Sequence, residues 1–86
     1  MKYRVEYALE AFSDLESLTP VVRERVISKI DWLAENFGEL TPQALTANLS
    51  GFFKLRVGDY RVIYEFDRDV KIIFIDGVSH RKDVYH

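Results

Sequence analysis

Apolar and polar positions change their spacing several times along the sequence, and each spacing predicts an element. At the start, the tyrosines and valine at 3, 5 and 7 alternate with Arg4 and Glu6. Because side chains on a strand point alternately to opposite faces, this alternation predicts a strand with one apolar face. From residue 8 to residue 18, apolar residues recur every third position, which is typical of one face of a helix. The apolar stripe predicted for this helix consists of Leu9, Phe12, Leu15 and Leu18.

A second helix is predicted to begin where Thr19 and Pro20 interrupt the first stripe. Threonine is favoured at the N-cap, and proline is favoured at the first helical position because its missing N–H needs no partner there. Gly38 provides the stop signal, since glycine is favoured just after a helix. The two helices are therefore expected to form a hairpin. The apolar stripe of the second helix consists of Val22, Val26, Ile30, Leu33 and Phe37.

The second half of the sequence reads as strands. Residues 39–51 have weak periodicity and are predicted to form a loop, and strands follow at about 52–57, 60–67 and 70–76. Gly58-Asp59 fits a two-residue hairpin turn with glycine at its first central position. Residues 77–86 form a mostly polar tail. The order strand, helix, helix and three strands predicts an α+β fold, with a helical hairpin on one face of a mostly antiparallel four-stranded sheet.

The Gly58-Asp59 turn also predicts the register of the hairpin, with Arg56 directly opposite Arg61. Opposed residues share a face, and faces alternate along each strand. One face of the hairpin is then apolar and should meet the helices, while the other gathers three cations. The apolar face carries Phe53, Leu55, Val57, Tyr60, Val62, Tyr64 and Phe66. The other face carries Phe52, Lys54, Arg56, Arg61, Ile63 and Glu65.

Two opposed arginines destabilise a sheet by about 0.2–1 kcal/mol, so their presence indicates a functional demand for an anion-binding site. The alternative is an ordinary solvated face on which Glu65 and Asp59 balance the arginines. If strand 70–76 pairs beside 60–67, the tail begins at a sheet edge and can bring Arg81 and Tyr85 to Arg61. The alternative for the tail is a frayed terminus.

Composition narrows the class of protein. The 86 residues form a single domain, residues 1–86, and nearly half of them are apolar. No apolar run of about 18 residues and no basic-then-apolar leader are present, so we expect no membrane span and a cytoplasmic location. With no cysteine, and with His80 and His86 as the histidines, no metal site and no cofactor are expected.

Charge is unevenly distributed along the chain, whose net charge is −2. Residues 1–49 hold five basic and eight acidic residues, net −3, and residues 50–86 hold seven basic and six acidic residues, net +1. An anion-binding site is therefore expected in the second half, built from a few placed cations. Long-range steering of nucleic acid by the whole molecule should be weak.

Three stretches together resemble the RelE/ParE toxins. The run at 48–64, NLSGFFKLRVGDYRVIY, is similar to the central hairpin of that superfamily, and HRKDVY at 80–85 is similar to its closing motif. YRVEY at 3–7, with the later Asp14-Leu15, is similar to its opening strand and first helix. The resemblance covers essentially the whole chain, and it implies the fold derived above.

The resemblance also implies an activity: ribosome-dependent cleavage of mRNA in the A site, without a metal, by attack of a 2′-hydroxyl on the neighbouring phosphorus. Lys54, Arg61, Arg81 and Tyr85 match the catalytic residues of the superfamily. Arg56, His80 and Lys82 are then expected to contact RNA, with His80 a candidate acid or base as well. The expected partners are the ribosome with its mRNA, and a cognate antitoxin whose segment over the cations should be acidic. The toxin–antitoxin complex is expected to bind DNA and repress its own synthesis.

Two departures from the superfamily pattern keep other functions open. Phe52 stands where some members have a second lysine, and Gln43 stands where others have a glutamate base. One alternative is a non-enzymatic ParE-type inhibitor of DNA gyrase, although that branch usually lacks the Arg-plus-Tyr tail. Another is an inactive relative that acts only together with its antitoxin.

Overall fold

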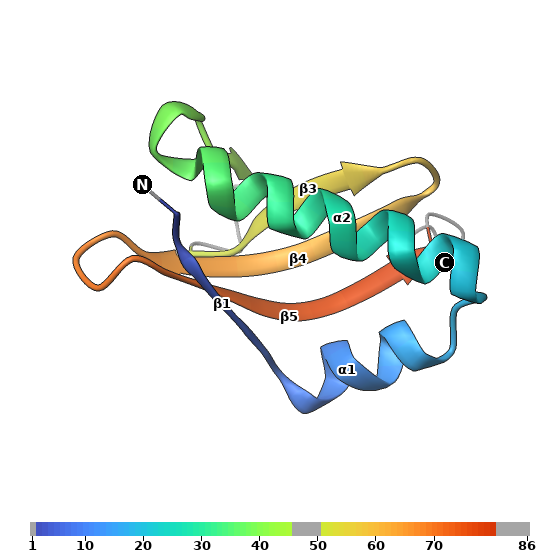
Figure 1. Ribbon diagram of the computed structural model, residues 1–86. Coiled ribbons are helices and arrows are strands. Elements are labelled where there is room, and N and C mark those ends of the chain that lie inside the picture. Colours follow the sequence, from blue (N-terminus) through green and yellow to red (C-terminus); the bar gives the residue numbers. More distant parts are fainter. Residues whose placement is uncertain (1, 46–50, 81–86) are drawn as a thin grey trace.

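The computed structural model describes residues 2–45 and 51–80 (Figure 1). Its strands form one five-stranded sheet in the order β1-β5-β4-β3-β2. Helix α2 crosses one face of this sheet, and α1 lies beside β1 and β5 (Figure 1). The elements in chain order are β1 (Arg4–Tyr7), α1 (Leu9–Glu16), α2 (Pro20–Asn36), a 3₁₀ turn (Phe37–Glu39), β2 (Gln43–Ala44), β3 (Phe53–Val57), β4 (Tyr60–Asp67) and β5 (Ile72–His80).

The α+β class and the mostly antiparallel sheet are confirmed, but the sheet has five strands rather than four. The additional strand is β2, which pairs with β3 inside the predicted loop. Its two residues, Gln43 and Ala44, are too few to produce an alternating pattern. The last strand was also placed wrongly. It continues to His80, and β1 pairs with it in parallel, so over its first half it lies inside the sheet rather than at an edge.

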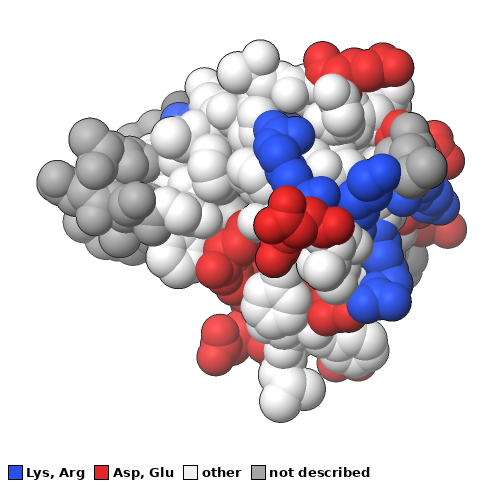
Figure 2. Space-filling view, turned by 90° about the vertical axis from the view of Figure 1, so that its left-hand side faces the viewer, with Lys and Arg blue, Asp and Glu red and all other residues white. Residues whose placement is uncertain are grey.

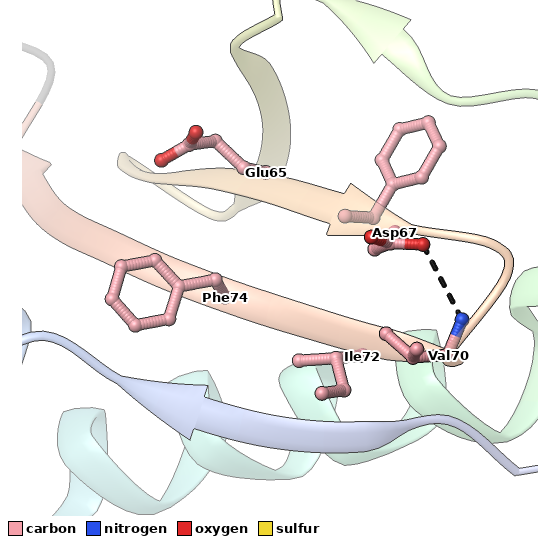
Figure 3. Close-up of a pocket in the computed structure, with 6 residues that line it drawn as sticks. Glu65, Asp67, Val70, Ile72 and Phe74 are labelled. Atoms are coloured by element: carbon pink, nitrogen blue, oxygen red, sulfur yellow. Dashed lines mark hydrogen bonds between the residues drawn. The ribbon is translucent and has the colours of Figure 1, made fainter.

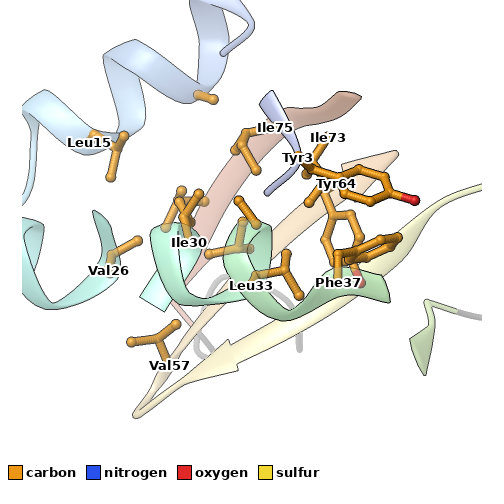
Figure 4. Close-up of a cluster of buried hydrophobic side chains, with 14 residues drawn as sticks. Tyr3, Leu15, Val26, Ile30, Leu33, Phe37, Val57, Tyr64, Ile73 and Ile75 are labelled. Carbon is orange, nitrogen blue, oxygen red and sulfur yellow. The ribbon is translucent and has the colours of Figure 1, made fainter. Parts of the chain in front are cut away.

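The hydrophobic core lies between α2 and the sheet (Figure 4). The predicted stripe is largely confirmed. Val26, Ile30 and Leu33 of α2 are buried, Val22 is partly buried, and Phe37 is buried in the 3₁₀ turn that follows the helix. The ring of Phe37 is central to the packing, because its centroid lies 4.9 Å from that of Tyr3 and 4.8 Å from that of Phe66. Aromatic pairs at this distance and tilt attract each other beyond simple burial. The largest fully buried side chains are Tyr64, Phe37, Ile30, Ile73, Ile75, Val26 and Val62.

The stripe predicted for α1 is wrong in its first half. Leu9 and Phe12 are 89% and 56% exposed, whereas Ala11 and Leu15 are buried. Helix α1 has only eight residues and packs chiefly against β5, so a single narrow face, spaced by four residues, is enough to cover that contact. The predicted stripe used a spacing of three residues, and its first members, Leu9 and Phe12, lie on a neighbouring side of the helix that faces away from the core.

The turn between the helices is held by Arg23 of α2. Its Nε donates a hydrogen bond to the carbonyl of Leu15 at 2.9 Å. Its Nη2 donates to the carbonyls of Glu16 at 3.1 Å and Leu18 at 2.9 Å. The last carbonyls of a helix have no intrahelical donor, so this guanidinium satisfies the end of α1 and ties it to α2.

Candidate active site

The face of the sheet turned away from α2, here called the outward face, carries the predicted cations. In the β3–β4 hairpin Arg56 pairs with Arg61 and Lys54 pairs with Ile63, as the turn predicted. Val62 and Tyr64 of β4 are buried on the helix side. Because side chains alternate along a strand, the three cations lie on the opposite, outward face. The opposed arginines therefore form a real rung of the sheet.

The hairpin turn explains why this register is unambiguous. Gly58 has φ 59°, in the left-handed region that glycine adopts without strain. A two-residue turn with glycine at its first central position matches the twist of the flanking strands. Any other residue at position 58 would have a strained backbone. Glycine therefore permits this tight turn, and the turn places Arg56 opposite Arg61.

Arg61 is only partly exposed, and its environment differs from that of a solvated surface arginine. Its Nε is buried and has no hydrogen-bond partner. Within residues 2–45 and 51–80, no ion pair joins Lys54, Arg56 or Arg61 to an acid, and Glu65 forms a hydrogen bond with Asp76 instead. A buried donor without a partner costs about 1–3 kcal/mol, and the forked guanidinium is suited to phosphate. These observations favour an anion site over the solvated-face alternative.

Gln43 joins this face through the strand that the sequence did not reveal. In β2 it pairs directly with Lys54, which has Ile63 on its other side. Opposed residues share a face, so the amide of Gln43 belongs to the outward face beside the lysine. Phe52 lies two residues before Lys54 and contributes an apolar ring where a second lysine would add charge. Gln43 was missed as a neighbour of Lys54 because β2 has no pattern of its own.

A β-bulge in β5 changes which side chains reach the outward face. Ile63 pairs with Gly77 and Tyr64 pairs with Ile75, so Asp76 is an extra residue. A bulge of this kind reverses the alternation of faces beyond it. Consequently Ile75 and Val78, three residues apart, are both buried on the helix side.

Beyond the bulge, Ser79 pairs with Arg61 and His80 pairs with Tyr60. The rings of His80 and Tyr60 meet edge to face, with centroids 5.0 Å apart. Tyr60 alternates with Arg61, so this contact lies on the other side of the sheet from the arginines. The structure therefore brings Ser79, and not the predicted His80, beside Arg61.

The outward face also carries an acidic pair, Glu65 and Asp76, that sequence reasoning did not identify. Burial raises the pKa of Asp76 to about 6, and the hydrogen bond and charge of Glu65, with the charge of Glu10, act in the same direction. The Oδ2 atom of Asp76 is buried without a donor. The sequence did not indicate that Asp76 lies inside a strand, because the strand was predicted to end at residue 76, whereas it continues to His80.

A shallow hollow of about 370 Å³ occupies the other end of the β4–β5 pair (Figure 3). Asp67 orders the turn beside it by accepting hydrogen bonds from the backbone N–H groups of Asp69 at 2.9 Å and Val70 at 3.3 Å. The hollow is separate from the Arg56–Arg61 rung. Its lining consists of Glu65, Phe66, Asp67, Val70, Ile72 and Phe74.

The charge pattern is mixed on the side of the molecule that Figure 2 shows, where Lys and Arg side chains lie among Asp and Glu. This agrees with the weak net charge and indicates local rather than long-range attraction of an anion. Among the described residues, no group of three side chains is arranged to hold a metal ion. No helix in the described part of the chain is long and apolar enough to cross a membrane.

The sequence and the fold both match known toxins. A sequence profile described as the ParE toxin of the type II toxin–antitoxin system parDE matches residues 5–85. The chain belongs to the RelE/ParE superfamily. It is a RelE-like toxin of a type II toxin–antitoxin system, as the resemblance in its sequence motifs implied.

Individual relatives of this RelE-like toxin cover nearly its whole length. Toxin RelG of Mycobacterium tuberculosis is 32% identical over an alignment of 91 positions, which covers 99% of this chain and 98% of RelG. In the toxin–antitoxin complex RelBE2 from the same organism, one chain is 28% identical with a TM-score of 0.83, covering 94% of this chain and 93% of that one. A chain of the archaeal RelE–RelB complex from Pyrococcus horikoshii is 28% identical with a TM-score of 0.73, covering 94% and 97%.

The remaining predicted site residues of this RelE-like toxin are Arg81, Lys82 and Tyr85, and they lie outside the described residues. Their roles stay predictions from the closing HRKDVY motif. Of the other predicted residues, the sheet brings Lys54, Arg56 and Arg61 to one face and turns His80 to the other.

Proposed function

We propose that this toxin is a ribosome-dependent endoribonuclease that needs no metal ion and cleaves mRNA in the A site, which inhibits translation. The observation that carries the proposal is the outward-face rung of Arg56 and Arg61, in which the buried Nε of Arg61 has no partner. A phosphate oxygen is a suitable acceptor for such a donor. The superfamily is one in which this kind of cleavage is known, and the relatives at 28–32% identity are toxins of the RelE branch.

The chemical step is the one that the family resemblance implies. The 2′-oxygen forms a bond to the adjacent phosphorus, its proton passes to a base, and the bond from phosphorus to the 5′-oxygen breaks. The departing 5′-oxygen takes a proton from an acid, which leaves a cyclic phosphate on one fragment and a 5′-hydroxyl on the other. Negative charge that develops on the phosphate oxygens is stabilised by Arg61, with Arg81 as its predicted partner. Lys54 assists proton transfer or stabilises charge, Tyr85 acts as the base or stacks on a nucleobase, and Arg56 and Lys82 hold the RNA.

His80 has a different role in this proposal from the one its sequence position implied. Its ring packs on Tyr60, on the helix side of the sheet. An RNA strand that lies across Arg56 and Arg61 is on the opposite side. His80 is therefore assigned to packing rather than to RNA contact or proton transfer.

An antitoxin is the second part of the proposal. The similar structures from M. tuberculosis and P. horikoshii are described as toxin–antitoxin and RelE–RelB complexes. A segment that covers Lys54, Arg56 and Arg61 must offer carboxylates to them, because their charges have no ion-pair partner among the described residues. We expect the cognate antitoxin to present an acidic segment there and to carry the DNA-binding part of an autorepressing complex.

Inhibition of DNA gyrase by a non-enzymatic ParE-type toxin is the second candidate. The matching profile bears the ParE name, which favours it. The two functions make different demands on the outward face, because a binder needs a contact surface whereas a nuclease needs Arg61 for the reaction itself. An inactive relative, acting only with its antitoxin, is a further outcome of the same test.

The deciding experiment maps RNA ends in a translating cell-free system after addition of the toxin. We expect cuts within translated codons, and about 10²–10³-fold slower cleavage by Arg61→Ala, the loss typical of one charge-stabilising donor. Arg81→Ala should act in the same direction. Arg25→Ala, which removes an exposed cation from α2, is the matched control and should cleave normally.

Each alternative gives a distinct result in this experiment. Full cleavage by Arg61→Ala would contradict the catalytic assignment. An absence of cuts, together with lost supercoiling activity of purified gyrase, would select the gyrase inhibitor. An absence of both effects would select the inactive relative.

A further inference from the structure

On the side away from β4, the last part of β5 is bordered by a helix rather than by a strand. Pairing with β1 ends where the N–H of Ala8 donates to the carbonyl of Ile75 at 2.9 Å. From there α1 runs beside β5 (Figure 1). The carboxylate of Asp14 accepts a hydrogen bond from the backbone N–H of Val78 at 2.9 Å, and so takes the place of a strand carbonyl. A side chain 64 residues away in sequence thus satisfies this donor.

The bulge is shaped to admit this carboxylate. A Cβ on Gly77 would lie 3.3 Å from Oδ2 of Asp14, which is tighter than an ordinary contact. Glycine at this position therefore lets the side-chain oxygen reach the amide of the next residue. Asp14, Gly77 and Val78, here called the Asp14 latch, form one contact between α1 and the bulge of β5.

The Asp14 latch decides which side chains face Arg61. A slip of one residue moves every side chain of a strand to the other face. With the bulge in place, Val78 is buried at 7% exposure and Ser79 pairs with Arg61. Without it, the alternation that begins at Ile75 would put Val78 on the outward face and Ser79 among the core residues. The hydrogen bond from Val78 to Asp14 is made only in the bulged register.

We propose that Asp14 is a positioning residue for the outward-face site: by holding the amide of Val78 it fixes the register that places Ser79 beside Arg61. It acts through the backbone of β5 and touches no substrate. The inference rests on the proposed function, because the reaction that it supports is RNA cleavage at Arg61. Asp14 can affect the cleavage rate from a distance because catalysis requires close alignment, and small displacements of catalytic groups slow reactions strongly.

The test compares Asp14→Ala with Asp14→Asn, whose amide oxygen can still accept the bond from Val78. Ile30→Val is the control for a modest loss of stability, because it removes one methyl group from a buried side chain far from the Asp14 latch in sequence. In single-turnover cleavage of ribosome-bound mRNA, Asp14→Ala should slow the chemical step by about tenfold or more, with little change in half-saturation. Asp14→Asn should recover most of the rate, and Ile30→Val should cleave as the wild type does.

A second readout does not depend on cleavage. Amide hydrogen exchange of Val78 should become faster in Asp14→Ala, and the NMR contact between the Tyr60 and His80 rings should weaken. If Asp14→Ala folds too poorly for study, Gly77→Ala crowds the same carboxylate and should show both effects to a smaller degree.

The outcomes separate this inference from the proposed function. Cleavage by Asp14→Ala at the rate of Ile30→Val, with unchanged exchange of Val78, would overturn the role of Asp14 and leave the nuclease intact. A rate that falls equally in Asp14→Asn and Asp14→Ala would overturn it too, because charge rather than the hydrogen bond would then matter. A wild-type protein without any cleavage would overturn the proposed function. The hydrogen exchange of Val78 in Asp14→Ala would then be the test of the role of Asp14.

Discussion

The two faces of the β3–β4–β5 sheet come from the same strands but differ in chemistry: one is apolar and buried, and the other carries charged side chains. On the helix side, Val62, Tyr64, Ile73 and Ile75 are buried against α2, and no buried polar residue is found among the described residues of the core. On the outward face Arg56 opposes Arg61. There, too, an arginine nitrogen and an aspartate oxygen are buried without partners.

This difference separates what packing requires from what chemistry requires. A buried apolar face is stabilised by removal of its side chains from water, and any well-fitting set of apolar residues serves. Opposed like charges and unpartnered polar atoms cost free energy and bring no packing in return. Such unfavourable features are expected where a bound ligand can pair with the charges and polar atoms, so the outward face is the candidate functional surface.

The largest effect on stability is expected on the helix side, for Phe37→Ala. Phe37 is fully buried and contacts the rings of Tyr3 and Phe66, so its removal leaves a cavity in the centre of the core. The free energy of unfolding should fall by about 3–5 kcal/mol, measured by urea denaturation. Phe12→Ala is the matched control, because that ring is more than half exposed and its loss should change stability by less than about 0.5 kcal/mol. Equal losses in the two variants would contradict the assigned core.

A smaller effect of opposite sign is expected on the outward face, for Arg56→Gln. Removal of one of two opposed arginines should raise the free energy of unfolding by about 0.2–1 kcal/mol. The gain should shrink in 1 M salt, because salt screens repulsion between exposed charges. Cleavage should weaken in the same variant, since Arg56 is proposed to hold RNA. Arg25→Gln on α2 is the control for loss of a cation, and a destabilised Arg56→Gln would contradict the account of the rung.

The same contrast explains how much the sequence could predict. The Gly58-Asp59 turn fixed the pairing of Arg56 with Arg61, and period-two alternation then assigned every side chain of the hairpin to its face. The stripe of α2 was equally predictable, because a long helix on a sheet must bury one face. These features depend on local geometry repeated over many residues.

The wrong or missing predictions depend on contacts between distant segments. The bulge at Asp76 is made together with Asp14 of α1, and no local pattern around residue 76 contains that partner. It turns His80 toward Tyr60, on the face opposite Arg61, a placement that the local sequence did not indicate. In the same way, β2 exists because Gln43 and Ala44 meet β3, and α1 exposes Leu9 because β5 is its main contact.

The last effect is expected from the acidic pair of the outward face, and it depends on pH. The pKa of Asp76 is raised from its ordinary 3.8 to about 6, by burial first and then by Glu65 and Glu10. Between these two values the native protein holds a proton that the unfolded chain releases. The native state therefore binds more protons, and stability falls as pH rises through this window. Above about pH 6 the whole penalty is present.

Asp76→Asn tests this directly, because an amide cannot ionise and can donate a hydrogen bond to Glu65. Relative to the wild type, the variant should gain thermal stability at pH 7 and gain little or nothing at pH 4, where the wild-type carboxyl group is largely protonated. Glu24→Gln, an exposed acid on α2, is the control and should show no such difference between the two pH values. A gain at pH 4 as large as that at pH 7 would mean that the aspartate is disfavoured by its shape or packing. The raised pKa would then not explain the cost, and the outward face would lose one of the strained features that set it apart from the core.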